Sequence, residues 1–199
     1  MLEPTGNVMD GKVDAGGLDA SDIPQYTYDS LGNCKNIRLL TIHPGSGSQN
    51  LTCTLVHYDS EQANTCYEAI SYTWGDSSSR AIIFIEDDGS CRQLSVTKNC
   101  ESMLHRLRRT GSARLVWVDA ICINQTNILE RNSQVAIMSD IYRNANRVVI
   151  YIGEMTQESD VAIDALLNWR GDRLYGFEEG LAIKDAVRKF YERPWFHRV

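Results

Sequence analysis

The stretch ARLVWVDAICINQTNILERNSQVAIMSDIYRNANRVVIYIGE, residues 113–154, decides the fold class of this chain of 199 residues. Its first part, 113–123, is continuously apolar, which predicts an interior strand. Asn127 is then expected to cap a helix that runs to about Ala145, and 147–154 predicts another buried strand. Two buried strands joined by a helix form a βαβ unit, whose strands run parallel.

The rest of the chain adds strands before this unit and helices on either side of it. Alternating or continuous apolar patterns predict strands, and apolar residues at helical spacing predict helices. The expected elements are strands at 36–45, 50–58 and 67–76, a β-hairpin at 80–96 turning at Asp88–Gly89, and helices at 97–109, 159–169 and 180–191. The predicted fold class is therefore α/β, with a central, mostly parallel sheet flanked by helices and with antiparallel strands and a β-hairpin added early in the chain.

The first residues of the chain differ in composition from the rest. They are rich in Gly, Asp and Ser and have no periodicity, so we expect residues 1–33 to be a flexible leader before one domain of residues 34–199. They also lack the basic segment followed by an apolar segment that marks a secretory signal peptide. No apolar run approaches the roughly 18 residues that span a bilayer. We therefore expect a cytoplasmic protein without a membrane span.

Composition and motifs argue against three further kinds of binding site. The formal net charge is −6, which argues against nucleic acid as the main partner because phosphate backbones require a basic surface. The six cysteines form no C-x-x-C pair and the four histidines are scattered, so no metal site is expected. Neither a G-x-G-x-x-G nor a P-loop pattern occurs, which excludes those two phosphate cradles.

Three polar residues interrupt the buried side of the helix predicted after Asn127. On a helical wheel Gln134 lies at the centre of the apolar arc, and Glu130 and Arg131 flank it one turn earlier. In one interpretation they are structural. The helix dipole then favours Glu130 in the first turn, Arg131 pairs with a carboxylate, and Gln134 forms a hydrogen bond with backbone at the edge of the sheet. In the other they face a ligand, because open α/β sheets bind ligands at the carboxyl ends of their strands.

A second polar cluster, SYTWGD at 71–76, ends another buried strand. If the two strands are parallel neighbours, this cluster and Glu130 share one edge of the sheet. Trp74 is either a core residue or a platform on which a base or nicotinamide ring stacks. Asp119 is either a strand-end residue that bonds backbone amides or part of a pocket. Cys122 is more simply a buried thiol than a nucleophile.

Several long motifs together resemble the heterokaryon incompatibility domain of filamentous fungi. They are YEAISYTWGD, LSVTKNCESMLHRLR, VWVDAICINQTNILERNSQVAIMSDIYRNANRVVIYIGE and RPWFHRV, in the order of the family. This family is distantly similar to Toll/interleukin-1 receptor (TIR) domains, so the resemblance implies a TIR-like, flavodoxin-like sheet. Members usually continue past RPWFHRV, and the resemblance implies that the C-terminal part of the family pattern is truncated at Val199.

The resemblance also implies an activity. Many TIR domains cleave NAD at the nicotinamide–ribose bond with one glutamate on the helix after a central strand, and Glu130 is the matching position. NAD is then a substrate, and no cofactor is expected. The residues expected to bind NAD are the motif positions around this glutamate: Tyr72, Trp74, Gly75, Asp76, Asp119, Asn124, Gln125, Arg131 and Gln134.

Two functions follow from this resemblance. One is a cell-death effector that hydrolyses NAD, and the alternative is a non-enzymatic module that triggers incompatibility cell death by homotypic assembly. In both cases self-association is expected, and an upstream sensor protein is a further expected partner.

Overall fold

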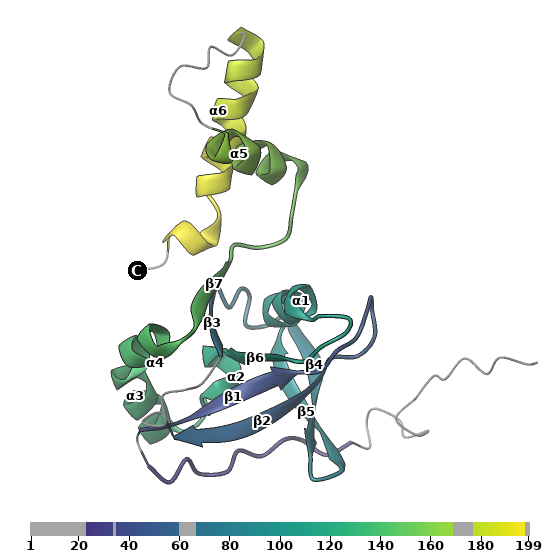
Figure 1. The fold of residues 1–199 in the computed structure, drawn as a ribbon, viewed down its shortest axis with the longest axis vertical. Helices are drawn as coiled ribbons and strands as arrows, with labels where there is room; N and C mark the ends of the chain where they lie inside the picture. Colours follow the sequence, from purple (N-terminus) through teal and green to yellow (C-terminus); the bar gives the residue numbers. More distant parts are fainter. Residues whose placement is uncertain (1–22, 34, 60–66, 169–176, 198–199) are drawn as a thin grey trace, which may run out of the picture.

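The computed structural model describes residues 23–33, 35–59, 67–168 and 177–197, and its centre is one mixed seven-stranded sheet with strand order β5-β4-β2-β1-β6-β3-β7 (Figure 1). The strands are β1 (Asn36–Ile42), β2 (Thr52–Asp59), β3 (Glu68–Tyr72), β4 (Arg80–Asp87), β5 (Ser90–Thr97), β6 (Arg114–Trp117) and β7 (Arg147–Tyr151). The helices are α1 (Lys98–Leu107), α2 (Asp119–Cys122), α3 (Ile128–Ala136), α4 (Met138–Asn144), α5 (Gln157–Leu167), α6 (Phe177–Tyr191) and the 3-10 helix η2 (Pro194–His197).

The α/β class is confirmed, but the prediction of a mostly parallel sheet is wrong. The pairs β3–β6, β3–β7 and β2–β4 are parallel, whereas β1–β2, β1–β6 and β4–β5 are antiparallel. The predicted early antiparallel strands and the hairpin are present. The sheet is mixed rather than mostly parallel because β1 also runs antiparallel to its other neighbour, β6. At the hairpin turn Asp88 and Gly89 both have positive φ, as an Asp-Gly turn of this type requires.

Two elements of the central unit differ from the prediction. The apolar run 113–123 is a strand only to Trp117, because the chain then turns into α2, where the Cys122 N–H bonds the Val118 carbonyl. The predicted helix 127–145 is divided into α3 and α4 at Ile137, whose N–H is shared between two carbonyls of the preceding turn. The predicted cap is confirmed, since the Asn127 side chain accepts a hydrogen bond from the Glu130 N–H.

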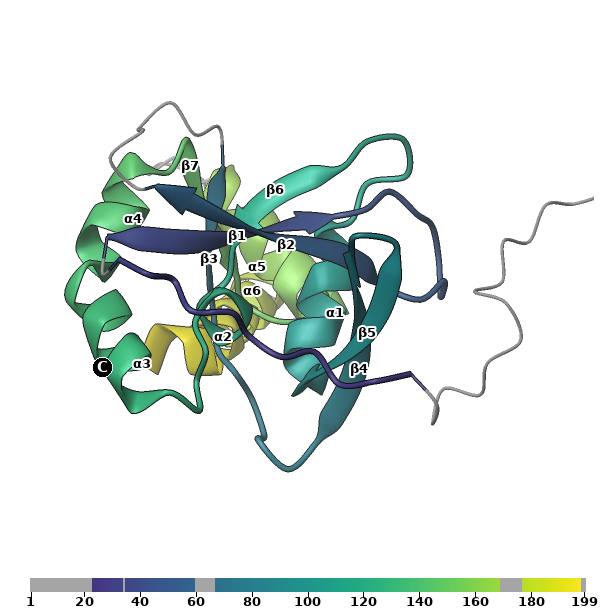
Figure 2. The same ribbon diagram turned by 90° about the horizontal axis from the view of Figure 1, so that it is seen from below.

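The core lies between the sheet and the helices that pack on it. α1 buries Cys100, Met103, Leu104 and Leu107, and the Thr97 side chain caps this helix by accepting the Cys100 N–H. α1 and the α3–α4 pair lie on opposite sides of the molecule in both views (Figures 1 and 2). α5 and α6 pack on each other and stand apart from the sheet (Figure 1). No helix in the described ranges is long and apolar enough to cross a membrane.

The segment 23–33 packs against the domain although the leader was predicted to extend through it. The Tyr26 N–H bonds the Gln93 carbonyl on β5, and the Tyr28 hydroxyl donates to the Ile121 carbonyl at 2.8 Å. Figure 2 shows this segment running from β5 across α2 towards β1. The packed part of the chain therefore begins before residue 34, and residues 1–22 lie outside the described ranges.

This packing predicts that the Tyr28 hydroxyl stabilises the whole domain. Tyr28→Phe removes the bond to the Ile121 carbonyl and should lower the free energy of unfolding by about 1 kcal/mol. Tyr28→Ala also removes the ring and should lower it by about 3 kcal/mol. Urea denaturation measures both values. Tyr26→Phe is the matched control, because no partner of that hydroxyl is found among the described residues, and an equal loss for Tyr26→Phe would contradict the prediction.

Candidate functional site

The carboxyl ends of β3 and β6 bring Trp74 and Asp119 together. β3 and β6 are parallel neighbours, so the residues that follow them meet at one edge of the sheet. The Trp74 indole Nε1 lies 3.1 Å from both carboxylate oxygens of Asp119 and donates to them. Asp119 also accepts the Ala120 N–H at 2.8 Å, and Trp74 is 42% exposed. The two strands are thus parallel neighbours, which is the condition under which SYTWGD and Glu130 are predicted to share one edge.

The loop after β3 is held by α1. Gly75 has φ +73, and a Cβ at this position would lie 3.0 Å from the Asn99 Cβ. The Asn99 amide donates to the Thr73 carbonyl, which fixes the loop that presents Trp74. A glycine is thus required here for both its backbone conformation and its closeness to α1.

Two other residues of this motif are engaged locally. Asp76 is exposed and accepts hydrogen bonds from the Ser78 hydroxyl and N–H, which lower the pKa of its carboxyl. Tyr72 is only 1% exposed, so its ring belongs to the core. Trp74 is therefore the ring of this cluster that reaches solvent.

The segment after α2 joins this edge to Glu130. The Gln125 amide donates to the Asp119 carbonyl at 2.8 Å, and the Asn124 N–H donates to Glu130 Oε1 at 2.8 Å. The Asn124 side chain closes a turn by accepting from the Thr126 N–H and hydroxyl. Asp119, Asn124, Gln125 and Glu130 are thus linked by consecutive contacts.

Glu130 is held in a buried ion pair with Arg38. Arg38 Nη1 lies 2.5 Å from Oε1 and Nη2 lies 3.1 Å from Oε2, and the two side chains are 0% and 9% exposed. Burial alone would raise the pKa of Glu130, but the hydrogen bonds from Arg38 and from the Asn124 N–H outweigh it and leave the pKa lowered. Glu130 is therefore ionised at neutral pH.

Arg38 was not singled out by sequence reasoning. Its guanidinium also donates to the carbonyls of Cys122 and Asp29, and it lies 5.0 Å from the centre of the Tyr28 ring. The available signal was its position in NIRLLTI, because a charge in a buried strand needs a partner.

Gln134 and Arg131 of α3, and Cys122 of α2, differ in their surroundings. Gln134 is fully buried, and its amide donates to the Asn36 carbonyl at 2.8 Å, which is the backbone bond that the structural interpretation predicts. Arg131 is exposed. Cys122 is fully buried, and burial raises the pKa of its thiol to about 12, so it is protonated at neutral pH.

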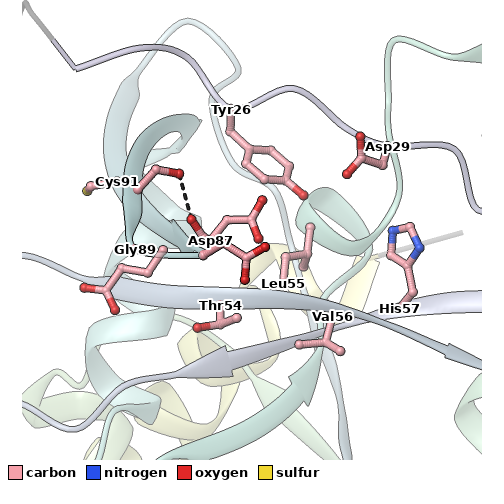
Figure 3. Close-up of a pocket in the computed structure, with 12 residues that line it drawn as sticks. Tyr26, Asp29, Thr54, Leu55, Val56, His57, Asp87, Gly89 and Cys91 are labelled. Carbon is pink, nitrogen blue, oxygen red and sulfur yellow. Dashed lines mark hydrogen bonds between the residues drawn. The ribbon is translucent and has the colours of Figure 1, made fainter.

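A hollow of about 670 Å³ lies on the surface beside Tyr26 and Asp29 (Figure 3). It is formed by the segment 23–33, β2 and the β4–β5 turn, and sequence reasoning did not predict it. Its lining includes four carboxylates, those of Asp29, Glu86, Asp87 and Asp88. In Figure 3 the Tyr26 ring projects over β2 between Asp29 and Asp87. Such a lining disfavours an anionic ligand such as a pyrophosphate. Among the described residues no group of acidic, histidine or cysteine side chains could hold a metal ion.

Comparison with known proteins agrees with the motifs of the site. The family model described as heterokaryon incompatibility protein (HET) matches residues 67–199, which include the Trp74–Asp119 contact and Glu130. The heterokaryon incompatibility protein 6, OR allele, of Neurospora crassa is 31% identical over 188 residues. That similarity covers 85% of this chain and 28% of the relative, so the chain spans little more than a quarter of the relative's length. No solved structure matches. The chain belongs to the heterokaryon incompatibility (HET) domain family.

Proposed function

We propose that this domain is the cell-death effector of an incompatibility reaction and that it hydrolyses NAD at the nicotinamide–ribose bond. Its fold would then be a distant variant of the TIR fold. The observation that carries the proposal is Glu130, a carboxylate that stays ionised beside the carboxyl edge of β6 and is linked through 119–125 to Trp74. An ionised carboxylate is the group that this reaction requires.

The chemistry follows from the charge that develops on the sugar. Cleavage of the glycosidic bond gives a ribosyl centre of oxocarbenium character. The Glu130 carboxylate would stabilise this positive charge and bond the ribose hydroxyls. The bond electrons move to the pyridinium nitrogen, so nicotinamide leaves as a neutral molecule without a general acid. Water then attacks the ribosyl carbon and loses a proton, which yields ADP-ribose.

The surrounding residues support roles in binding. Trp74 exposes part of a ring whose edge is held by Asp119, which suits stacking on a base or on nicotinamide. Arg131 is exposed in the first turn of α3 and would contact the pyrophosphate. The substrate would therefore approach from the Trp74 side rather than through the acidic hollow.

The ion pair with Arg38 implies that the domain must change before it acts. Both oxygens of Glu130 are occupied by Arg38 and by the Asn124 N–H. To reach ribose hydroxyls, the carboxylate has to exchange at least one of these bonds. An activation step, such as self-association or contact with an upstream sensor, would supply that rearrangement.

NAD turnover tests the catalytic role of Glu130. The wild-type chain incubated with NAD at high protein concentration should release nicotinamide, measured by chromatography, and Glu130→Gln should release about a thousandfold less because a transition-state charge loses its counter-charge. Trp74→Ala should mainly raise KM.

A second variant separates catalysis from folding. Arg38→Met/Glu130→Leu replaces the buried pair by apolar side chains, a change that usually preserves a fold. Folding is checked by circular dichroism. The proposal predicts a folded, inactive protein, and it is wrong if the wild type yields no nicotinamide or if the double variant retains turnover.

The lowered pKa of Glu130 also predicts how stability depends on pH. The folded pKa lies below the unfolded value of about 4.3, so the stabilisation is present above that value and disappears as the pH falls through the folded pKa. At pH 7, Glu130→Gln should lower the free energy of unfolding by about 3 kcal/mol, because it leaves Arg38 buried without a counter-charge.

Urea denaturation at pH 7 and below pH 4 measures this effect. The difference between the wild type and Glu130→Gln should shrink at the lower pH. Glu192→Gln, which breaks an exposed pair with Arg188, is the control and should change stability little at either pH. A difference that is independent of pH would refute the argument.

Homotypic assembly is a second candidate function, and the outer edge of β7 favours it. β7 pairs with β3 on one side and with no strand of the described ranges on the other, while Val148 and Ile150 are 46% and 50% exposed. The opposite edge of the sheet, at β5, is bridged by the chain's own Gln25. We propose that a second copy pairs with β7, since an antiparallel β7–β7 contact opposes Val148 to Ile150 and brings no like-charged side chains face to face.

Self-association is the readout for this edge. Light scattering coupled to gel filtration should detect oligomers that increase with concentration, and Ile150→Lys should abolish them because an edge lysine opposes strand pairing. Val56→Lys is the control, since Val56 is similarly exposed but lies on an interior strand. A wild type that stays monomeric, or an Ile150→Lys variant that associates as the wild type does, rules out this interface.

A further inference from the structure

Three arginines converge on one carboxylate at the amino ends of β3, β6 and β7. Glu68, the first residue of β3, accepts hydrogen bonds from Arg114 on β6 at 2.6 Å and from Arg147 on β7 at 2.9 Å. Arg109 Nη2, from the loop after α1, lies 3.8 Å from the Glu68 Oε1 atom. Glu68 is the only carboxylate in the described ranges that meets any of these arginines.

The charges of this arginine cluster, Arg109, Arg114 and Arg147 with Glu68, do not balance. Three guanidinium groups face one carboxylate, which leaves an excess of two positive charges. Burial alone would raise the pKa of Glu68, but the hydrogen bonds from Arg114 and Arg147 lower it. The Glu68 carboxylate is therefore ionised at neutral pH, and the net charge of the cluster is +2. The chain as a whole, in contrast, has a formal net charge of −6.

The exposure of the arginines divides the cluster into an inner and an outer part. The side chains of Glu68 and Arg114 are 10% and 12% exposed, and Arg114 also donates to the Leu107 carbonyl. The side chains of Arg109 and Arg147 are 49% and 57% exposed. Arg147 uses Nε and Nη2 on Glu68, which leaves Nη1 without a partner among the described residues. The inner pair thus fixes the cluster, and the outer pair keeps donors that face solvent.

We propose that Arg109 and Arg147 form a binding site for a dianionic phosphate group, braced from below by Glu68 and Arg114. The excess of two positive charges matches the charge of a phosphate monoester, and guanidinium forks match the geometry of its oxygens. The ligand class is therefore a small phosphorylated molecule or free phosphate.

This site is separate from the proposed NAD site. Glu68 begins β3, whereas Trp74 follows the end of the same five-residue strand, so the two lie about 13 Å or more apart along the sheet. The phosphate site does not depend on NAD hydrolysis. A phosphorylated ligand would bind at the amino ends of β3 and β6, whereas the candidate active site lies at the carboxyl ends of the same strands.

Titration with inorganic phosphate at constant ionic strength tests the proposal. Amide NMR shifts of the 199-residue chain should saturate with phosphate, and acetate, a monoanion, should bind at least about tenfold more weakly. Methyl phosphate and AMP are titrated in parallel: equal affinity for all three indicates a site for the phosphate group alone, and tighter binding of AMP indicates a nucleotide. Both results support the dianion site.

Charge-matched variants assign the binding to the two outer arginines. Arg109→Gln/Arg147→Gln should weaken phosphate binding by roughly tenfold or more. Arg143→Gln/Arg188→Gln removes the same charge from exposed arginines elsewhere and should leave the affinity unchanged. Equal weakening in both double variants, or no saturable binding by the wild type, overturns the proposal.

A variant of Glu68 distinguishes a ligand site from a structural ion-pair network. Glu68→Gln leaves three guanidinium groups without a counter-charge, so its melting temperature should fall. Phosphate should then raise the melting temperature of Glu68→Gln more than that of the wild type, because the dianion replaces the missing charge. A purely structural network predicts no such rescue, and that result would also reject the site.

Discussion

The buried guanidinium of Arg38 is the group on which the rest of the structure depends. It is fully buried on β1, and moving such a cation out of water costs several kcal/mol. The protein offsets that cost with the two oxygens of Glu130, the carbonyls of Cys122 and Asp29, and the ring of Tyr28. These partners come from α3, from α2 and from the N-terminal segment. Arg38 therefore has its full set of partners only when all three elements are packed against β1.

The same constraint organises the candidate site. Arg38 orients Glu130, Glu130 accepts the Asn124 N–H, and the neighbouring Gln125 bonds Asp119, which holds Trp74. The sequence predicts Glu130 because a polar residue on the apolar face of a helix can be recognised from helical periodicity alone. It predicts Trp74 and Asp119 because both follow the ends of apolar runs. It missed Arg38, since the partner lies 92 residues earlier and only the fold brings the two together.

The fold could be predicted to the level of its elements but not of their pairing. Periodicity, the Asn127 cap and the Asp88–Gly89 turn are local signals, and the structure contains the corresponding strands, helices and hairpin. The direction of β1 relative to β6 depends on contacts between distant residues, so nothing local encodes it. The apolar run 113–123 concealed α2 because residues buried on every side give the same pattern in a strand as in one helical turn.

Arginine–glutamate contacts serve two purposes in this molecule, and the balance of charge and exposure distinguishes them. At Arg38 and Glu130 one cation meets one anion, both are buried, and every carboxylate oxygen is occupied, so a ligand must first break the pair. At Glu68 three cations meet one anion, and two of the cations are about half exposed. If Glu130 acts in catalysis as proposed, the first arrangement is a closed state that an activation step must open. The second has charge left over at the surface, and an anion can satisfy it without disturbing the core.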